Sequence, residues 1–243
     1  MKVLIPKQHG AWAMLLIPFC LGMVKGGPVL WHITLFTGWL FLYLTVYPIT
    51  LAVKKKKKKK KTKDYQKWIF YYGIAACCSI IAVVIHKPAF IWLGFSLFPL
   101  FLVHVYYART KNERALLNDI AGVLFFSTGG LASCWLGAGS LDGWAWFIFA
   151  QSSLFFIGSS FYVKSMIREK NNKTFAYCSW GYHLLLPFLS ISLGASWGAL
   201  AFIPSSLRAW FLHGKERSIK TIGIHEIVNA CFFFAVICIF LTR

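Results

Sequence analysis

The sequence is poor in acidic residues, and this shortage argues against a soluble domain. Asp and Glu together number 7 among 243 residues, and charged residues of both signs make up 14% of the chain. Soluble domains carry about 25% charged and about 45–50% apolar residues, whereas 58% of this chain is apolar. A globule of this length keeps a large surface and cannot bury so many apolar side chains. We therefore predict a polytopic helical bundle in the membrane, with residues 1–243 forming a single transmembrane domain.

The common signatures of catalysis and cofactor binding are also missing. The seven cysteines include no C-x-x-C pair and no Cys/His metal spacing. Walker, G-x-G-x-x-G and H-E-x-x-H motifs are absent as well. We interpret the cysteines as small buried apolar residues. We predict no metal site and no cofactor, although a distant family likeness described below leaves magnesium open.

Nine apolar segments near the length of about 20 residues that crosses a bilayer fill most of the chain. They cover 10–27, 30–53, 68–86, 88–107, 117–138, 144–164, 177–194, 196–212 and 220–241. Of the 26 Lys and Arg residues, 22 fall on the amino-terminal side of the membrane and three on the other, with Arg208 inside a segment. Basic loops face the cytoplasm. The pattern predicts a multi-pass protein of the cell membrane, with a cytoplasmic amino terminus and an outer carboxyl terminus.

An unbroken run of eight lysines, Lys54 to Lys61, lies in the predicted basic loop 54–67. Like charges repel one another, so we predict that this loop is exposed to the cytoplasm. Each lysine near an anionic membrane surface adds about 1 kcal/mol of attraction. We expect anionic lipids as partners here. We expect no nucleic acid, because the basic residues lie in short patches between apolar segments.

Polar residues inside membrane segments are costly and therefore mark candidate sites. His225 and Glu226 lie early in the ninth segment, and Asn229 shares the helix face of Glu226. They suggest a proton relay or a ligand for a polar head group, or a packing hydrogen bond to another helix. Asn118 and Asp119 open the fifth segment. They suggest a binding site facing the cytoplasm, or an N-cap with a first-turn acid.

Two further pairs lie at predicted membrane boundaries. Lys164 and Arg168 are four residues apart at the end of the sixth segment, where their like charges repel. A shared phosphate or acidic lipid would relieve this repulsion, or the pair is ordinary cytoplasmic charge. Gln8 and His9 precede the first segment, and His9 either titrates near neutral pH or forms a satisfied interfacial hydrogen bond. The lone histidines of the fourth and seventh segments are interpreted as structural.

Three stretches of the chain resemble a family of bacterial membrane proteins. The opening Pro6-Lys7-Gln8-His9-Gly10-Ala11-Trp12-Ala13-Met14 closely resembles the amino-terminal signature of YwiC-like proteins. Similar pieces follow at Asn112-Glu113-Arg114…Asn118-Asp119 and at Phe161-Tyr162-Val163-Lys164…Ile167-Arg168-Glu169. The resemblance runs along most of the chain and implies an integral membrane protein, without implying an activity.

A more distant likeness is to the UbiA-type intramembrane prenyltransferases, which have nine helices, a cytoplasmic amino terminus and a cavity that opens to the cytoplasm. The piece Tyr106-Tyr107…Lys111 is similar to a tyrosine-and-base element of that superfamily. The likeness implies a UbiA-like bundle that holds a prenyl or quinone-like chain between helices. The residues that would bind its head group are Lys164, Arg168, Arg114, Asn118, Gln8, His9 and Tyr107.

The chain departs from that superfamily at its two aspartate-rich motifs, which hold Mg²⁺ against a prenyl diphosphate. Lysines follow the second segment, Lys164 and Arg168 follow the sixth, and Gly122 stands where an acid would continue Asn118-Asp119. Lysine and arginine can neutralise a diphosphate without a metal. The departure leaves prenyltransferase-like activity open.

Two hypotheses follow. The first is a UbiA-like protein that binds or modifies a prenyl, quinone-like or anionic lipid, and it requires the head-group residues to surround one cavity that faces the cytoplasm. The alternative is a proton- or ion-coupled transporter or an accessory membrane protein, and its transport form requires Asp119 and Glu226 on one polar route across the membrane. Candidate catalytic residues are Asp119, Glu226 and His225.

Overall fold

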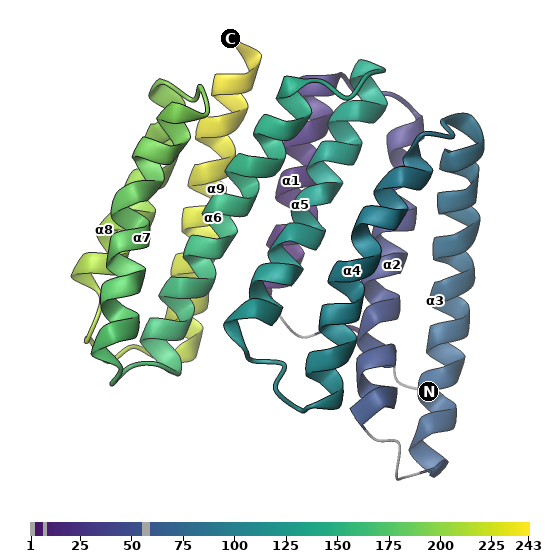
Figure 1. The fold of residues 1–243 in the computed structure, drawn as a ribbon, viewed down its shortest axis with the longest axis horizontal. Coiled ribbons are helices and arrows are strands. Elements are labelled where there is room, and N and C mark those ends of the chain that lie inside the picture. Colours follow the sequence, from purple (N-terminus) through teal and green to yellow (C-terminus); the bar gives the residue numbers. More distant parts are fainter. Residues whose placement is uncertain (1–2, 7–8, 55–58) are drawn as a thin grey trace.

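The computed structural model describes residues 3–6, 9–54 and 59–243, and all regular structure in these ranges is helical. The elements are α1 (His9–Gly26), α2 (Trp31–Lys54), α3 (Lys59–His86), α4 (Phe90–Arg109), α5 (Leu116–Ala138), α6 (Gly143–Ile167), α7 (Lys173–Ser192), η1 (Trp197–Phe202), α8 (Ile203–Phe211) and α9 (Ile219–Thr242). Successive α-helices run up and down beside one another, with the carboxyl terminus at the end of the bundle opposite the lysine-rich segment (Figure 1). The predicted all-α bundle is confirmed.

Six of the described helices are long and apolar enough to cross a membrane, namely α2, α3, α4, α5, α6 and α9. The helix α1 is apolar but shorter. The predicted eighth segment, 196–212, is not one continuous helix, because it divides into the 3₁₀ turn η1 and the short helix α8. Pro204 lies at the start of α8, where its missing N–H is tolerated. By length and composition, the protein is a multi-pass membrane bundle.

The basic loop predicted at 54–67 is shorter than expected. The helix α2 continues to Lys54 and α3 begins at Lys59, so residues 59–67 are helical. Lysine is a good helix former, and a lysine run can therefore continue a helix that its apolar neighbours begin. The run Lys54–Lys61 lies in part outside the described residues, at 55–58.

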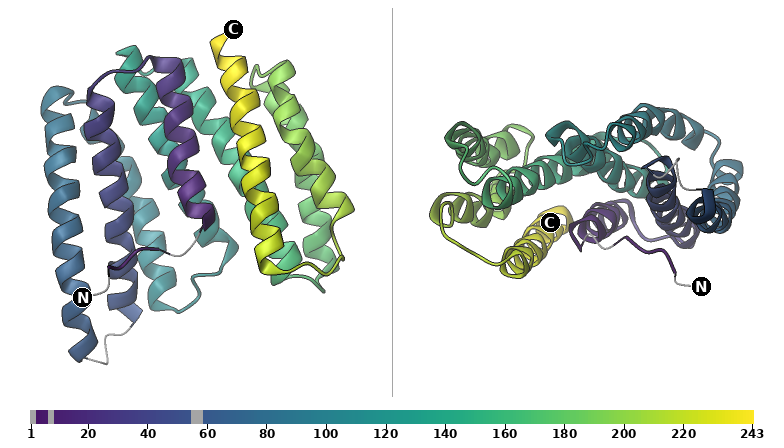
Figure 2. Two further views of the ribbon diagram at one scale, coloured as in Figure 1. Left: turned by 180° about the vertical axis from the view of Figure 1, so that it is seen from behind. Right: turned by 90° about the horizontal axis from the view of Figure 1, so that it is seen from below.

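The helices form two layers when the bundle is viewed along its helices (Figure 2). One layer holds α4, α5, α6 and α7, and the other holds α2, α1, α9 and α8, with α3 packed beside α2. The central contact is between α1 and α5, and α1 also packs against α9. The amino-terminal helix is therefore enclosed between elements from both halves of the chain.

Glycines bring the backbones of α1 and α5 into direct contact. A Cβ atom added at Gly22 would lie 2.2 Å from the carbonyl oxygen of Gly130, and one added at Gly26 would lie 2.4 Å from that of Cys134. A Cβ atom at Gly137 would lie 2.3 Å from the carbonyl oxygen of Gly27. Small residues allow such approach in lipid, where helix association depends on close packing.

The cysteines are less buried than predicted. Cys134 is buried at the α1–α5 contact, whereas Cys77, Cys78, Cys178 and Cys231 are exposed on α3, α7 and α9. A thiol behaves as a small apolar group, so the lipid-facing side of a helix accepts it as readily as the interior does.

The basic residues predicted on the outer side each contact another part of the bundle. Lys25 Nζ donates to the carbonyl oxygen of Leu241 at 3.1 Å and lies 3.8 Å from the centre of the Trp144 ring. Lys87 Nζ donates to the carbonyl oxygen of Trp135 at 2.9 Å. Both acceptors lie in the last turn of a helix, where cations are favourable. Desolvation by partial burial lowers the pKa of Lys87.

Replacing Lys87 by methionine is expected to lower the stability of the protein. The substitution keeps most of the apolar stem but removes a cation from the carboxyl end of α5, an effect worth about 0.3–1 kcal/mol. Thermal unfolding in detergent measures the change. Lys215→Met, at an exposed position in the α8–α9 loop, is the control and should leave the midpoint unchanged. Equal midpoints for wild type and Lys87→Met would contradict this role.

Candidate functional site

The charged residues that the sequence suggested lie at one end of the bundle, on either side of α6. We call this the basic end. The helices α2, α4, α6 and α8 finish there, and α5, α7 and α9 begin there (Figure 1). The Asp119–Lys164 cluster consists of Lys54, Glu113, Arg114, Asn118, Asp119, Lys164 and Arg168. The Arg208–Glu226 cluster consists of Ser159, Tyr162, Ser205, Arg208, Glu226 and Asn229.

A buried ion pair is the centre of the first cluster. Lys164 Nζ lies 2.8 Å from the carboxylate of Asp119, and the Lys164 side chain is 7% exposed. The same ammonium group donates to the backbone carbonyl of Arg114. A buried ammonium is tolerated only with such partners. Asp119 occupies the first turn of α5, as predicted, and its charge is also favourable at a helix amino terminus.

Exposed cations surround this pair. Arg114 and Arg168 are both exposed at the membrane boundary. Partial burial and the charge of Arg114 lower the pKa of the Arg168 guanidinium, and Asp119 opposes the shift. Lys54 forms an ion pair with Glu113 and so joins the end of α2 to the α4–α5 loop. Four cationic side chains therefore accompany two carboxylates, and the cluster carries a net positive charge.

Asn118 does not cap α5. The N-cap residue is Ala115, and Asn118 instead donates from Nδ2 to the backbone carbonyl of Glu113 at 2.7 Å. Its side chain also lies beside His104 of α4, which interacts with Asp119 as well. The N-cap interpretation of Asn118 was therefore wrong, because the helix begins earlier than the polar residues suggested.

The second cluster centres on an arginine that the sequence analysis did not select. Arg208 of α8 forms an ion pair with Glu226 of α9, and their side chains are 7% and 17% exposed. Arg208 Nη2 also donates to Ser159 Oγ at 3.3 Å. The guanidinium carbon lies 4.4 Å from the centre of the Tyr162 ring. A lone arginine inside an apolar segment was the signal for this site.

A second polar contact between α8 and α9 lies one turn from the ion pair. Asn229 Nδ2 donates to Ser205 Oγ at 2.9 Å, and both side chains are buried. The shared face predicted for Glu226 and Asn229 thus packs against α8. His225 precedes this face on α9 and is half-buried.

Each predicted acid has a cation of its own, on opposite sides of α6. Asp119 pairs with Lys164, whereas Glu226 pairs with Arg208. Both pairs lie toward the basic end. This arrangement differs from the single polar route across the membrane that the transport hypothesis requires.

The remaining predicted residues add little to either cluster. Tyr107 is half-buried near the end of α4, with its ring edge-on to Tyr106 at 5.3 Å between centres. Gln8 lies outside the described residues, as does the side chain of His9, whose backbone begins α1. Over residues 3–6, 9–54 and 59–243, no three His, Cys, Asp or Glu side chains are grouped as a metal ion would require.

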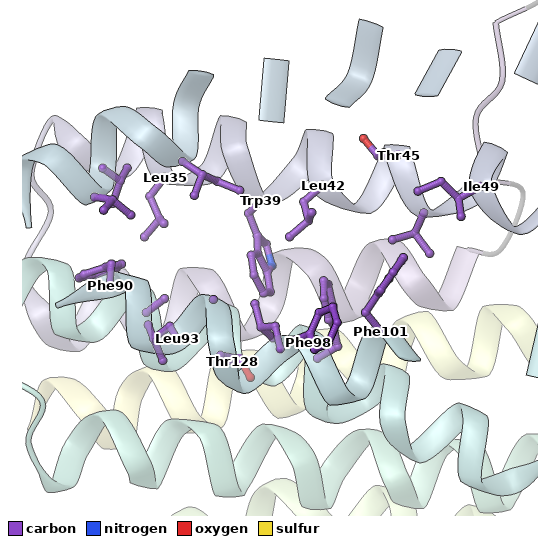
Figure 3. Close-up of a pocket in the computed structure, with 18 residues that line it drawn as sticks. Leu35, Trp39, Leu42, Thr45, Ile49, Phe90, Leu93, Phe98, Phe101 and Thr128 are labelled. Carbon is purple, nitrogen blue, oxygen red and sulfur yellow. The ribbon is translucent and has the colours of Figure 1, made fainter. Parts of the chain in front are cut away.

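An apolar cavity of about 380 Å³ lies between α2, α3, α4 and α5. Trp39 extends from α2 into its middle, toward side chains of α4 (Figure 3). The indole ring stacks on Phe125 with 5.0 Å between centres. The hydroxyl groups of Thr45 and Thr128, which also line the cavity, donate to carbonyls of their own helices. The cavity therefore offers an apolar surface, and nothing in the apolar composition of these segments predicted where it lies.

The cavity approaches the Asp119–Lys164 cluster along α2. Its lining includes Ile49 on α2 and Phe101 on α4. Lys54 follows Ile49 by five residues, or about 7.5 Å along a helix. Charged side chains at the membrane boundary thus lie near one end of an apolar cavity within the membrane segments.

Comparison with known proteins agrees with the resemblance seen in the sequence. A family model described as YwiC-like protein matches residues 5–134. The Bacillus subtilis (strain 168) protein named "Uncharacterized protein YwiC" is 73% identical over the whole of both chains. The chain belongs to the YwiC-like family. A Haemophilus influenzae (strain ATCC 51907 / DSM 11121 / KW20 / Rd) protein, named "Uncharacterized protein", is 35% identical over 98% of this YwiC-like chain and 99% of its own.

No solved structure matches the chain. The family model spans every residue that lines the apolar cavity, together with Glu113, Arg114, Asn118 and Asp119. Lys164, Arg168 and the whole Arg208–Glu226 cluster follow the matched segment. The family segment therefore contains the cavity and the acidic half of the Asp119–Lys164 pair, but not its cation.

Proposed function

We propose that this YwiC-like protein binds an amphiphilic lipid that has a long prenyl or quinone-like chain and an anionic head group. The observation that carries the proposal is the apolar cavity between α2 and α5, which approaches a cluster of net positive charge. The chain of the lipid would lie in the cavity, and its head group would contact the cluster.

The cavity fits the apolar part of such a ligand. Its volume of about 380 Å³ falls in the range of about 300–1,000 Å³ that is usual for ligand sites. Both threonine hydroxyls in its lining are satisfied by their own helices, and the buried indole N–H of Trp39 is the lining group without a hydrogen-bond partner among the described residues. Trp39 and Phe125 offer flat aromatic surfaces to an unsaturated chain or a ring.

The cluster fits the anionic part. Arg114 and Arg168 are exposed, whereas Lys164 is already neutralised by Asp119. Exposed guanidinium groups bind phosphate through paired hydrogen bonds. The proposed site is thus on the cytoplasmic side of the cell membrane, where anionic lipids near Lys54–Lys61 are proposed as further partners.

The proposed arrangement would resemble that of the UbiA-type enzymes, with a chain between helices and a head group at the cytoplasmic end. Because the aspartate-rich motifs are missing, we propose binding without Mg²⁺. The alternative function, proton- or ion-coupled transport, would use the Arg208–Glu226 pair, but this pair and Asp119–Lys164 both lie toward the basic end and form no route across the membrane.

Filling the cavity is expected to weaken lipid binding. Gly94 lines the cavity, and a Cβ atom added there meets nothing within 4 Å, so Gly94→Phe should occupy the space without displacing the backbone. We expect the affinity for geranylgeranyl diphosphate to fall by about tenfold or more, which corresponds to about 1.4 kcal/mol. Tryptophan fluorescence of the protein in detergent, in the presence of EDTA, measures this binding.

Gly73→Phe is the matched control, because Gly73 of α3 is also unobstructed but does not line the cavity. The double variant Arg114→Gln/Arg168→Gln tests the head-group contact and should weaken the diphosphate more than the uncharged prenyl alcohol. Unchanged affinity in Gly94→Phe, or binding that requires Mg²⁺, would contradict the proposal.

A further inference from the structure

The surroundings of Arg208 point to a second site, and we propose that it binds a small carboxylate anion together with a proton taken up by Glu226. This site lies on the other side of α6 from the lipid cavity. It does not depend on the lipid-binding proposal.

The helices around Arg208 bury several polar side chains among apolar ones. On α8, Ser205 and Arg208 are buried, whereas Leu207, Trp210 and Phe211 are exposed. The buried residues of α6 and α7 include apolar side chains such as Phe155, Phe156 and Leu186, and among them lie the polar residues Gln151, Ser152, Ser159, Ser179, His183 and Ser190. A polar interior is costly in a membrane protein, and it marks sites that take polar ligands.

Arg208 already binds one carboxylate. Glu226 contacts Nη1, Ser159 accepts weakly from Nη2 at 3.3 Å, and the flat face of the guanidinium lies over Tyr162. The buried Nε atom has no hydrogen-bond partner among the described residues. Arginine binds carboxylates through two parallel N–H groups, so the geometry leaves capacity for a carboxylate from outside the chain. In the structure, the Glu226 carboxylate occupies the position at Arg208 that such a ligand would take.

Other buried groups beside Arg208 also lack partners within the described chain. The Tyr162 hydroxyl and His183 Nε2 are both fully buried and unpaired. His183 Nδ1 lies 2.7 Å from the backbone carbonyl of Ser179, so Nδ1 carries the hydrogen and Nε2 is free to accept. Buried polar groups are normally paired. These unpaired atoms can bind a hydroxyl or carbonyl group of a small organic acid.

Charge balance connects the anion to a proton. Arg208 and Glu226 together are neutral, and a bound carboxylate would add one uncompensated negative charge at a buried position, which is strongly unfavourable. A proton on Glu226 restores neutrality and releases Arg208 to the ligand. The proton comes from water at the basic end, and no covalent bond to the ligand forms or breaks.

Other titratable groups lie near this pair. Tyr162 on α6 and His183 on α7 interact electrostatically with Arg208, and Arg217 of the α8–α9 loop interacts with Tyr162. His225 precedes Glu226 on α9. Among these residue types, histidine is the one that takes up a proton near neutral pH. His183 is the other group that could take the proton, so the test includes His183→Gln.

The test is the thermal stability of the purified protein in detergent with sodium acetate or sodium lactate, against sodium chloride at equal ionic strength. For wild type, we expect the carboxylates to raise the midpoint by several degrees at mildly acidic pH and to leave it unchanged at mildly basic pH. Glu226→Gln should gain the same stabilisation at both pH values, because the internal carboxylate is gone. His183→Gln should behave as wild type does.

The double variant Arg208→Met/Glu226→Gln is the control and should not respond to carboxylates. If the carboxylates stabilise Glu226→Gln but have no effect on wild type at either pH, the ion pair is structural and the proposal is overturned. A carboxylate effect that persists in the double variant would also overturn it. Loss of the pH dependence in His183→Gln would place the proton on His183 and refute the assignment to Glu226.

Discussion

Gly22→Ala is expected to prevent the protein from reaching its folded state. The new Cβ atom would lie 2.2 Å from the carbonyl oxygen of Gly130 and 2.8 Å from the backbone nitrogen of Cys134. Both neighbours are backbone atoms of α5, so a side-chain rotation cannot relieve the contact. Overpacking typically costs about 1–3 kcal/mol and occasionally more, and here α1 must separate from α5. We expect aggregated protein after detergent extraction, measured by size-exclusion chromatography.

Gly73→Ala provides the matched control for this substitution. Gly73 lies within α3, and an added Cβ atom meets nothing within 4 Å. Alanine favours helix over glycine by about 1 kcal/mol, so this variant should elute as wild type does and unfold at the same or a higher temperature. A monodisperse Gly22→Ala protein with wild-type stability would show that α1 and α5 are farther apart than described here.

Arg208→Met is expected to destabilise the protein much more than the simultaneous replacement of both members of its ion pair. The single change leaves the Glu226 carboxylate largely buried without its cation, and breaking a buried pair in this way costs about 3–5 kcal/mol. Arg208→Met/Glu226→Met removes both charges and should recover most of that loss. Denaturant or thermal unfolding of the three proteins in one detergent measures the difference.

The exposed pair between Lys170 and Glu216 is the control for this comparison. Its side chains are 41% and 89% exposed, although its atoms approach to 2.7 Å. Exposed ion pairs contribute little, so Lys170→Met should leave stability essentially unchanged. If Arg208→Met were equally harmless, the buried pair would have no part in holding α8 against α9.

The sequence predicted the helical membrane architecture well, because apolar segment length and the distribution of Lys and Arg are local properties of the chain. The first hypothesis required Asp119, Lys164 and Arg168 to lie together, but the sequence left their convergence open; in the structure Asp119 and Lys164 form an ion pair. The sequence did not predict the partner of Glu226, since Arg208 lies 18 residues away on another helix and their pairing depends on how α8 turns. Pro204 and the 3₁₀ helix η1 before it set the orientation of α8.

The apolar cavity could not be predicted for a related reason. Its lining alternates along α2, α4 and α5 with residues of the same apolar types that pack against neighbours or face lipid. Composition therefore cannot separate a cavity wall from a packed interface. The distinction depends on the distance between helices. The close approach of Trp39 on α2 to Gly129 on α5 helps to set that distance.

The contact between the first and last helices has a consequence for how the protein is made. Lys25 donates to the carbonyl of Leu241, which lies 216 residues later in the chain. Synthesis at about 5–20 residues per second places about 10–40 s between the two. We expect α1 to enter the membrane well before Leu241 is synthesised. The glycine contact with α5 can form much earlier, and it would hold α1 in place while the side of α1 that meets α9 still lacks its partner.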